Sequence, residues 1–154
     1  MRRKDKSMQG EDLRRLLRNG EYGVLSTVDS QGQPYGVPLN YVYDENCVYF
    51  HCAIEGHKLN NLSANGKVSF CVVGHTRVLP SEFNTEFESV IVFGEASVVQ
   101  GDERHRALVK LVEKYSPEFI EEGHKYIAQH DTRTKVVKIV IHSVTGKAKL
   151  SGKM

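Results

Sequence analysis

The sequence predicts a mainly β protein in which six antiparallel strands form a closed or nearly closed barrel with short helices around it. Two observations support this prediction: six segments are rich in residues that favour strands, and polar turns or short helical segments separate them. The 154 residues are 40% hydrophobic and 26% charged, which is ordinary for a globular protein. This length fits one domain over residues 1–154.

The first half of the chain is predicted to be a helix followed by three strands. Leucines at helical spacing predict a short amphipathic helix over residues 11–19, and Gly20 fits its C-cap. Strand-forming residues over 22–28 and 33–43 flank a polar turn, so these two segments form a hairpin. A third strand follows over residues 47–52, and a short helix comes after it.

The second half contains the remaining strands and two longer helices. Three further strands are expected, over residues 67–73, 90–99 and 134–143. The middle one is apolar on both faces, as a central strand would be, and an irregular loop around Pro80 precedes it. Asp102 is predicted to cap a helix that ends near Tyr115, and Pro117 to start another helix.

Composition excludes several classes of protein. A net charge of +2 is too small for a nucleic-acid-binding surface, and the basic residues Arg2 and Arg3 are expected to form a solvated tail. No apolar stretch approaches the roughly 18 residues that span a bilayer, and no signal peptide is recognisable. Three cysteines without a CxxC motif, and histidines without zinc spacing, argue against disulfides and metal. We therefore expect a cytoplasmic protein without nucleic acid, membrane or metal partners.

Residues 51–62 carry the clearest chemical signal in the sequence. A strand passes through Gly56 into a helix whose first turn holds His57 and Lys58. The unpaired N–H groups and the positive dipole at a helix N-terminus suit a phosphate, and a glycine lets the backbone approach it closely. The alternative is that Lys58 is a basic residue merely exposed at a helix start.

Two other features allow more than one interpretation. Pro38 donates no ladder hydrogen bond, so it marks an edge strand or a bulge. The backbone there either faces a ligand or simply turns a barrel corner. Glu86 and Glu88 precede the central strand. We expect them to be solvated carboxylates rather than acid–base residues.

Several short motifs occur in a specific order and spacing. They are Met1-Arg2-Arg3-Lys4, Gly23-Val24-Leu25-Ser26-Thr27, Tyr35-Gly36-Val37-Pro38, Tyr49-Phe50-His51, Gly56-His57-Lys58 and Glu88-Ser89-Val90-Ile91-Val92-Phe93-Gly94. Together they resemble the pyridoxamine 5′-phosphate oxidase-like flavin-binding split barrels, and within these the nitroimidazole-resistance (Nim) branch. The resemblance runs from residue 1 to about Lys147. It implies a six-stranded antiparallel split β-barrel that holds FMN at the interface of a homodimer.

The resemblance also implies positions for the cofactor. It assigns the phosphate to His57 and Lys58, the flavin ring and ribityl chain to Val37, Pro38, Leu39, Asn40, His51 and Cys52, and a contact from the opposing subunit to Ser89. Val37 stands where the oxidases have an arginine, and Ser89 where they usually have a glutamine. We therefore expect FMN to bind more weakly than in the oxidases.

The function implied is that of an FMN-dependent oxidoreductase that reduces a small planar acceptor such as a nitroaromatic or nitroimidazole compound. His51 matches the histidine proposed to be reactive in the Nim branch; alternatively, it is a strand-end histidine hydrogen-bonded to backbone near the flavin. Cys52 points to the opposite face of the strand, so the two residues cannot easily act as a dyad.

Vitamin B6 oxidation is not expected, because the chain lacks tryptophan and lacks the aromatic and arginine residues of the oxidase tail. The alternative function is a non-catalytic flavin- or haem-binding protein that stores, carries or senses its cofactor. In that case His51, His57 or His75 would offer an axial ligand to haem.

Overall fold

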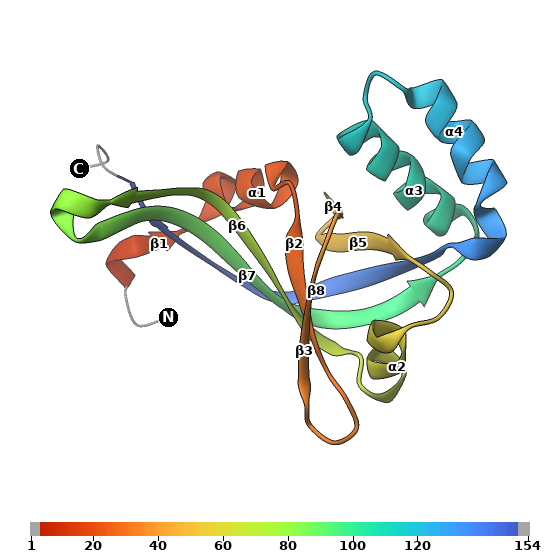
Figure 1. The fold of residues 1–154 in the computed structure, drawn as a ribbon, viewed down its shortest axis with the longest axis horizontal. Helices are drawn as coiled ribbons and strands as arrows, with labels where there is room; N and C mark the ends of the chain where they lie inside the picture. The colour runs from red at the N-terminus through yellow and green to blue at the C-terminus, as the bar shows by residue number, and fades with distance from the viewer. Residues whose placement is uncertain (1–3, 151–154) are drawn as a thin grey trace.

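A computed structural model describes residues 4–150 and shows one antiparallel sheet with helices beside it (Figure 1). Its strands are β1 (Ser7–Met8), β2 (Gly23–Val28), β3 (Pro34–Leu39), β4 (Val42–Asp44), β5 (Cys47–Cys52), β6 (Lys67–Leu79), β7 (Asn84–Val99) and β8 (Lys135–Lys149). Its α-helices are α1 (Gly10–Asn19), α2 (His57–Ala64), α3 (Gly101–Tyr115) and α4 (Ile120–Gln129). Single 3₁₀ turns cover Lys4–Lys6, Pro80–Glu82 and Asp131–Arg133. The expected tail residues Arg2 and Arg3 lie outside the described residues.

The sheet is open, as a split barrel requires. Its strand order is β3-β2-β6-β7-β8-β5-β4, with β1 added beside β8. The two end strands, β3 and β4, follow one another in the chain but do not pair with each other within residues 4–150. The predicted mainly β split-barrel class is confirmed. The count rises from six strands to eight because the predicted strand over residues 33–43 divides at Asn40 and Tyr41, and because β1 is added.

Two hydrophobic clusters hold the elements together. The larger one fills the barrel, where alternate residues of the strands point inward, and α1 covers it with Leu16 and Leu17. The smaller one lies under α3 and α4, where Leu108 and Leu111 pack with Val136 and other residues of the sheet. None of the helices within residues 4–150 combines the length and the apolar character needed to cross a bilayer.

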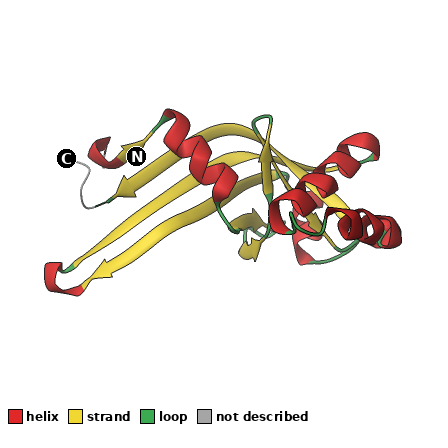
Figure 2. Cartoon of the chain, turned by 90° about the horizontal axis from the view of Figure 1, so that it is seen from above, coloured by secondary structure: helices red, strands yellow, loops and turns green. Residues whose placement is uncertain are grey.

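The long strands β6 and β7 form a hairpin that projects from the rest of the molecule (Figure 2). The irregular loop expected around Pro80 is only a 3₁₀ turn at its tip. The expectation that Glu86 and Glu88 are solvated was wrong, because they are only 5% and 7% exposed. Arg77 donates to Glu86 over 2.8 Å, and the Arg15 guanidinium donates to Glu88 over 3.0 Å.

Two helix starts differ from their predicted positions. Gln100 rather than Asp102 is the N-cap of α3, and Asp102 lies in the first turn, where its charge suits the helix dipole. Pro117 does not start α4, which begins at Ile120. The residues between form a turn, in which the Phe119 N–H donates to the Ser116 carbonyl.

Candidate functional site

The start of α2 has the features of an anion-binding site. Gly56 has φ +144°, a conformation that favours glycine, and it turns the chain sharply from β5 into the helix. Among the described residues, no side chain caps this N-terminus, and no acidic residue lies in its first turn. His57 and Lys58 are the first two residues of this turn, whose N–H groups are open. This set of donors fits a phosphate group.

The ring of His57 is held by a neighbouring strand. It stacks on the ring of Tyr35 from β3, with 4.2 Å between ring centroids and 20° between planes. The helix itself is anchored by the buried Asn61, whose side-chain amide donates to the Thr27 hydroxyl of β2 over 2.9 Å. The phosphate-binding residues proposed from the sequence are therefore fixed against the β2–β3 edge.

His51 and Cys52 lie at the end of β5 and point to opposite faces, as predicted. The Cys52 side chain is buried in the barrel, and burial raises the pKa of its thiol. The His51 side chain keeps contact with solvent on the outer face. The surrounding protein nevertheless lowers the pKa of His51, mainly by partial burial and secondarily through the charge of Lys58. The same charge acts on Cys52, so the start of α2 lies close to the end of β5.

The third group of proposed residues lies on the edge strand β3. Pro38 pairs with Val24 in an unbroken register, so the edge interpretation is correct and the bulge is not present. Val37 and Leu39 are half-buried, whereas Pro38 and Asn40 are exposed. The Asn40 amide donates to the Glu21 carbonyl over 3.1 Å, which fixes this side chain at the end of β3.

A cavity of about 240 Å³ links two of these residues to the helices. It is lined by Asn40 and His51 on the barrel side and by residues of α3, α4 and the segments that follow them on the other. Sequence reasoning did not find this helical wall. The spacing of Tyr126 and His130, four residues apart, is the one signal that could have indicated that they share a face.

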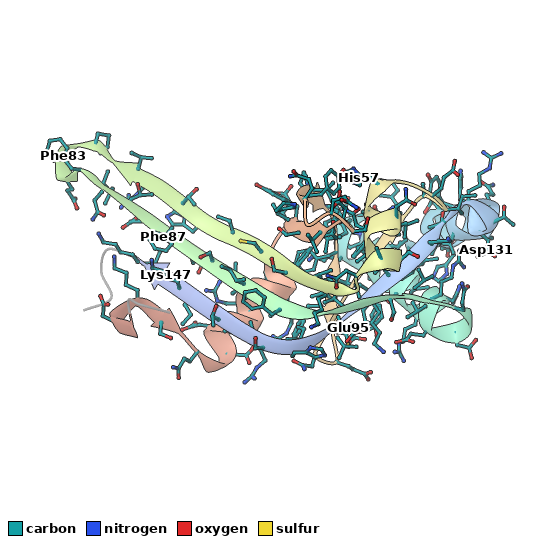
Figure 3. The ribbon with its side chains drawn as sticks, turned by 90° about the horizontal axis from the view of Figure 1, so that it is seen from below. His57, Phe83, Phe87, Glu95, Asp131 and Lys147 are labelled. Atoms are coloured by element: carbon teal, nitrogen blue, oxygen red, sulfur yellow. The ribbon has the colours of Figure 1, made fainter. Side chains whose placement is uncertain are left out.

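Ser89 is not brought together with the other candidates in this chain. It lies on the outer face of β7, paired with Val73 of β6 and Lys147 of β8. Figure 3 shows Lys147 toward the projecting hairpin and His57 well away from it. Ser89 therefore lies apart from the start of α2 within one chain. Within residues 4–150, no group of three or more histidine, cysteine or acidic side chains is arranged to hold a metal ion.

An open antiparallel sheet with helices at its sides is the architecture of the split β-barrel class. The sequence profile of the pyridoxamine 5′-phosphate oxidase family matches residues 9–148. The chain therefore belongs to this family. None of the curated proteins matches its sequence significantly.

Solved structures share the fold at low sequence identity. A conserved hypothetical protein from Mycobacterium tuberculosis has a TM-score of 0.82 at 20% identity, over 99% of this chain and 98% of that one. A proposed 5-nitroimidazole antibiotic resistance protein from Bacteroides thetaiotaomicron has a TM-score of 0.73 at 20% identity, over 92% and 86%. An FAD- and haem-binding protein from Mycobacterium smegmatis has a TM-score of 0.76 at 19% identity, over 94% and 73%. At sequence identities this low, the similarity shows that these proteins share the fold and nothing further.

Proposed function

We propose that this protein is an FMN-dependent oxidoreductase that passes electrons to a small planar acceptor such as a nitroaromatic or nitroimidazole compound. The observation that carries the proposal is the position of the open start of α2 beside both His51 and the edge strand β3. The flavin, when bound, supplies the redox chemistry, and the protein binds and orients it. The likeness to a proposed nitroimidazole resistance protein supports this class of acceptor.

Each part of the site has a distinct role in this proposal. Lys58 and His57 hold the phosphate, and Val37, Pro38, Leu39, Asn40, His51 and Cys52 line the path of the ribityl chain and ring. The lowered pKa of His51 favours the neutral ring, which can donate one hydrogen bond and accept another beside the flavin. The three free cysteines fit the cytoplasmic location that we also propose.

The proposal includes a homodimer. We call the exposed hydrophobic residues on the outer face of β6 and β7 the outer patch; they are Val73, Val78, Ile91 and Phe93. Apolar side chains gathered on one face typically mark a binding surface. Ser89 lies on the same face as Ile91 and Phe93, so a second copy seated there would have Ser89 at the interface.

A substitution at Lys58 tests the phosphate assignment. Lys58→Met removes a charged hydrogen-bond donor, which is worth about 1.5–3 kcal/mol, so FMN affinity should fall by about tenfold to a hundredfold. Riboflavin, which has no phosphate, should bind equally well before and after the change. Lys67→Met, beyond the other end of α2, is the matched control. If FMN affinity survives Lys58→Met, or if riboflavin is affected equally, the assignment is wrong.

A non-catalytic flavin- or haem-binding protein is the second candidate function. The neutral His51 ring favours it, because a neutral imidazole is what iron coordination requires. The likeness to an FAD- and haem-binding protein also supports it. The Lys58→Met variant separates FMN binding from haem binding, since the loss of a phosphate contact should leave haem binding unchanged.

A further inference from the structure

The cavity between the helices and the barrel adjoins the proposed path of the flavin. Leu108, Leu111, Val112 and Ile127 contribute the apolar part of its wall. Asn40 and His51 lie on the opposite side, and both also belong to the proposed flavin site. A ligand in this cavity would therefore lie next to the bound cofactor.

The wall of the cavity is unsuited to a charged ligand. None of the described residues that line it is an aspartate, glutamate, lysine or arginine. Partial burial lowers the pKa of His51, which favours the uncharged form of that ring. Transferring a charge from water into an apolar site without an opposite charge is strongly unfavourable. The cavity therefore favours uncharged molecules over carboxylates and phosphate esters.

One side of the cavity is a pair of stacked rings. Tyr126 of α4 and His130, which directly follows α4, have centroids 4.0 Å apart and planes 24° apart. The Nδ1 atom of His130 lies 3.0 Å from the Tyr126 carbonyl oxygen, which can only accept, so Nδ1 donates this hydrogen bond and fixes the ring. This flat pair suits a planar aromatic ligand, because offset stacking of rings is favourable.

The size of the cavity limits the ligand further. Its volume of about 240 Å³ lies below the range of roughly 300–1,000 Å³ that holds drug-sized ligands. A single substituted ring fits that volume. We infer that the cavity is the acceptor site, that it selects small, uncharged, planar rings, and that Tyr126 and His130 determine this specificity. The inference rests on the proposed function, because an acceptor presupposes a bound redox cofactor.

Two probes that differ in one ring substituent, and through it in charge, test this selection. 4-Nitrobenzyl alcohol is neutral and 4-nitrobenzoate is an anion, while both carry the same ring and nitro group. Their dissociation constants are measured by calorimetry on the FMN-loaded protein, without turnover. We expect the alcohol to bind at least about tenfold more tightly than the anion, because the wall offers the anion no counter-charge.

Substitutions at Tyr126 assign the binding to this cavity. Tyr126 is largely exposed, so its replacement should leave the fold intact. Tyr126→Ala should lower the affinity for 4-nitrobenzyl alcohol by about threefold to tenfold. This fold-change corresponds to the stabilisation expected from one aromatic pair. Tyr126→Arg should raise the affinity for 4-nitrobenzoate. Phe119→Ala removes an equally exposed ring just before α4 that does not line the cavity. This variant should not change the dissociation constant of either probe.

The outcomes separate the inference from the proposed function. Equal binding of the two probes, or equal effects of Tyr126→Ala and Phe119→Ala, would overturn the cavity assignment even if FMN binds as proposed. If FMN fails to bind in a separate titration, the proposed function falls. In that case, charge-selective, Tyr126-dependent binding of the probes to the FMN-free protein would still support the ligand specificity of the cavity.

Discussion

At the scale of single residues, the site depends on side chains that hold other side chains in place. His57 is an example, because its ring rests on Tyr35 of the neighbouring strand. The sequence predicted His57 as a phosphate ligand but not its support. Tyr35 comes from a hairpin that precedes α2, and no local pattern shows which ring it faces.

This support can be tested by removing the ring of Tyr35. Tyr35→Leu keeps an apolar residue but loses the stack, which is worth about 0.5–1.5 kcal/mol, so FMN affinity should fall by about threefold to tenfold. Riboflavin affinity should change less, because the stack acts on the phosphate ligand. Tyr22→Leu, at an exposed tyrosine, is the control for the loss of a ring. An unchanged FMN affinity in Tyr35→Leu would show that the stack does not position His57.

Lys114 gives a prediction about pH. Its ammonium lies 3.9 Å above the Tyr41 ring and donates to the Tyr41 carbonyl, and burial lowers its pKa to about 8. An unfolded lysine has a pKa of about 10.4. Between about pH 8 and 10 the unfolded chain therefore binds more protons than the folded one, so the stability contributed by this group rises with pH in that window.

The comparison of wild type with Lys114→Met isolates this effect. Urea unfolding midpoints of both proteins are measured from pH 7.5 to pH 10. As the pH rises, the unfolding midpoint of the wild type should increase relative to that of Lys114→Met. Only the wild type has a buried ammonium group, and deprotonation removes the unfavourable burial of its charge. If the two midpoints change in parallel from pH 7.5 to pH 10, the pKa of Lys114 is not lowered.

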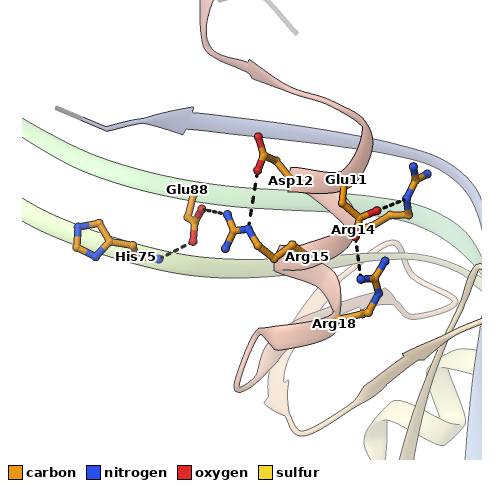
Figure 4. Close-up of polar contacts among 7 residues, drawn as sticks. All are labelled: Glu11, Asp12, Arg14, Arg15, Arg18, His75 and Glu88. Carbon is orange, nitrogen blue, oxygen red and sulfur yellow. Dashed lines mark hydrogen bonds and ion pairs between the residues drawn. The ribbon is translucent and has the colours of Figure 1, made fainter. Parts of the chain in front are cut away.

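At the scale of elements, one ion pair joins α1 to the projecting hairpin. Arg15 of α1 reaches Glu88 of β7, which also accepts from the backbone N–H of His75, whereas Arg14 pairs with the exposed Glu11 (Figure 4). Glu88 is buried, so losing the arginine that pairs with it should lower the free energy of unfolding more than losing the arginine that pairs with Glu11.

Two neighbouring arginines therefore make a matched pair of substitutions. Arg15→Ala leaves a buried carboxylate without this partner and should lower the free energy of unfolding by about 1–2 kcal/mol, discounted for the partial exposure of the arginine. Arg14→Ala should cost no more than about 0.5 kcal/mol, because its ion pair is exposed. Urea unfolding of both variants gives the comparison. Equal losses would show that the Arg15–Glu88 pair does not anchor α1.

The same hairpin shows why part of the fold was not predictable. Residues 86, 88, 90 and 92 of β7 alternate regularly toward the barrel side, but the first two are glutamates. A pattern based on hydrophobic residues therefore starts the strand at Val90. The buried carboxylates are compensated by Arg15 and Arg77 from other elements, and this long-range pairing cannot be seen in a local window. Strands with apolar inner faces, such as β2 and β5, were predicted almost to the residue.

At the scale of the whole molecule, we propose that two chains together complete the flavin site. Ser89 lies far from α2 in one chain but shares a face with the outer patch. The sequence alone suggests the proposed phosphate end, because Gly56, His57 and Lys58 are consecutive. The cavity was not predictable, because its wall combines β3 and β5 with helices that come much later in the chain.

A charge in the outer patch tests the dimer. Phe93→Asp places a carboxylate in a surface that we expect to be buried between subunits, so sedimentation velocity should show a monomer at micromolar concentration. FMN affinity should fall together with dimer formation, since each site would lose the contribution of Ser89 from the second copy. Val98→Asp, on the same strand but outside the patch, should remain dimeric. A dimeric Phe93→Asp protein with normal FMN binding would contradict this interface.

The central claim is that the protein binds FMN through its phosphate and uses it as a redox cofactor. The most direct measurement is an absorbance titration of the purified protein with FMN, riboflavin and haemin, followed by reduction of the flavin complex and addition of 4-nitrobenzyl alcohol. The account predicts that FMN binds more tightly than riboflavin and that the reduced flavin spectrum returns to the oxidised one when the acceptor is added. A sharp Soret band with haemin, while FMN stays unbound, would contradict it.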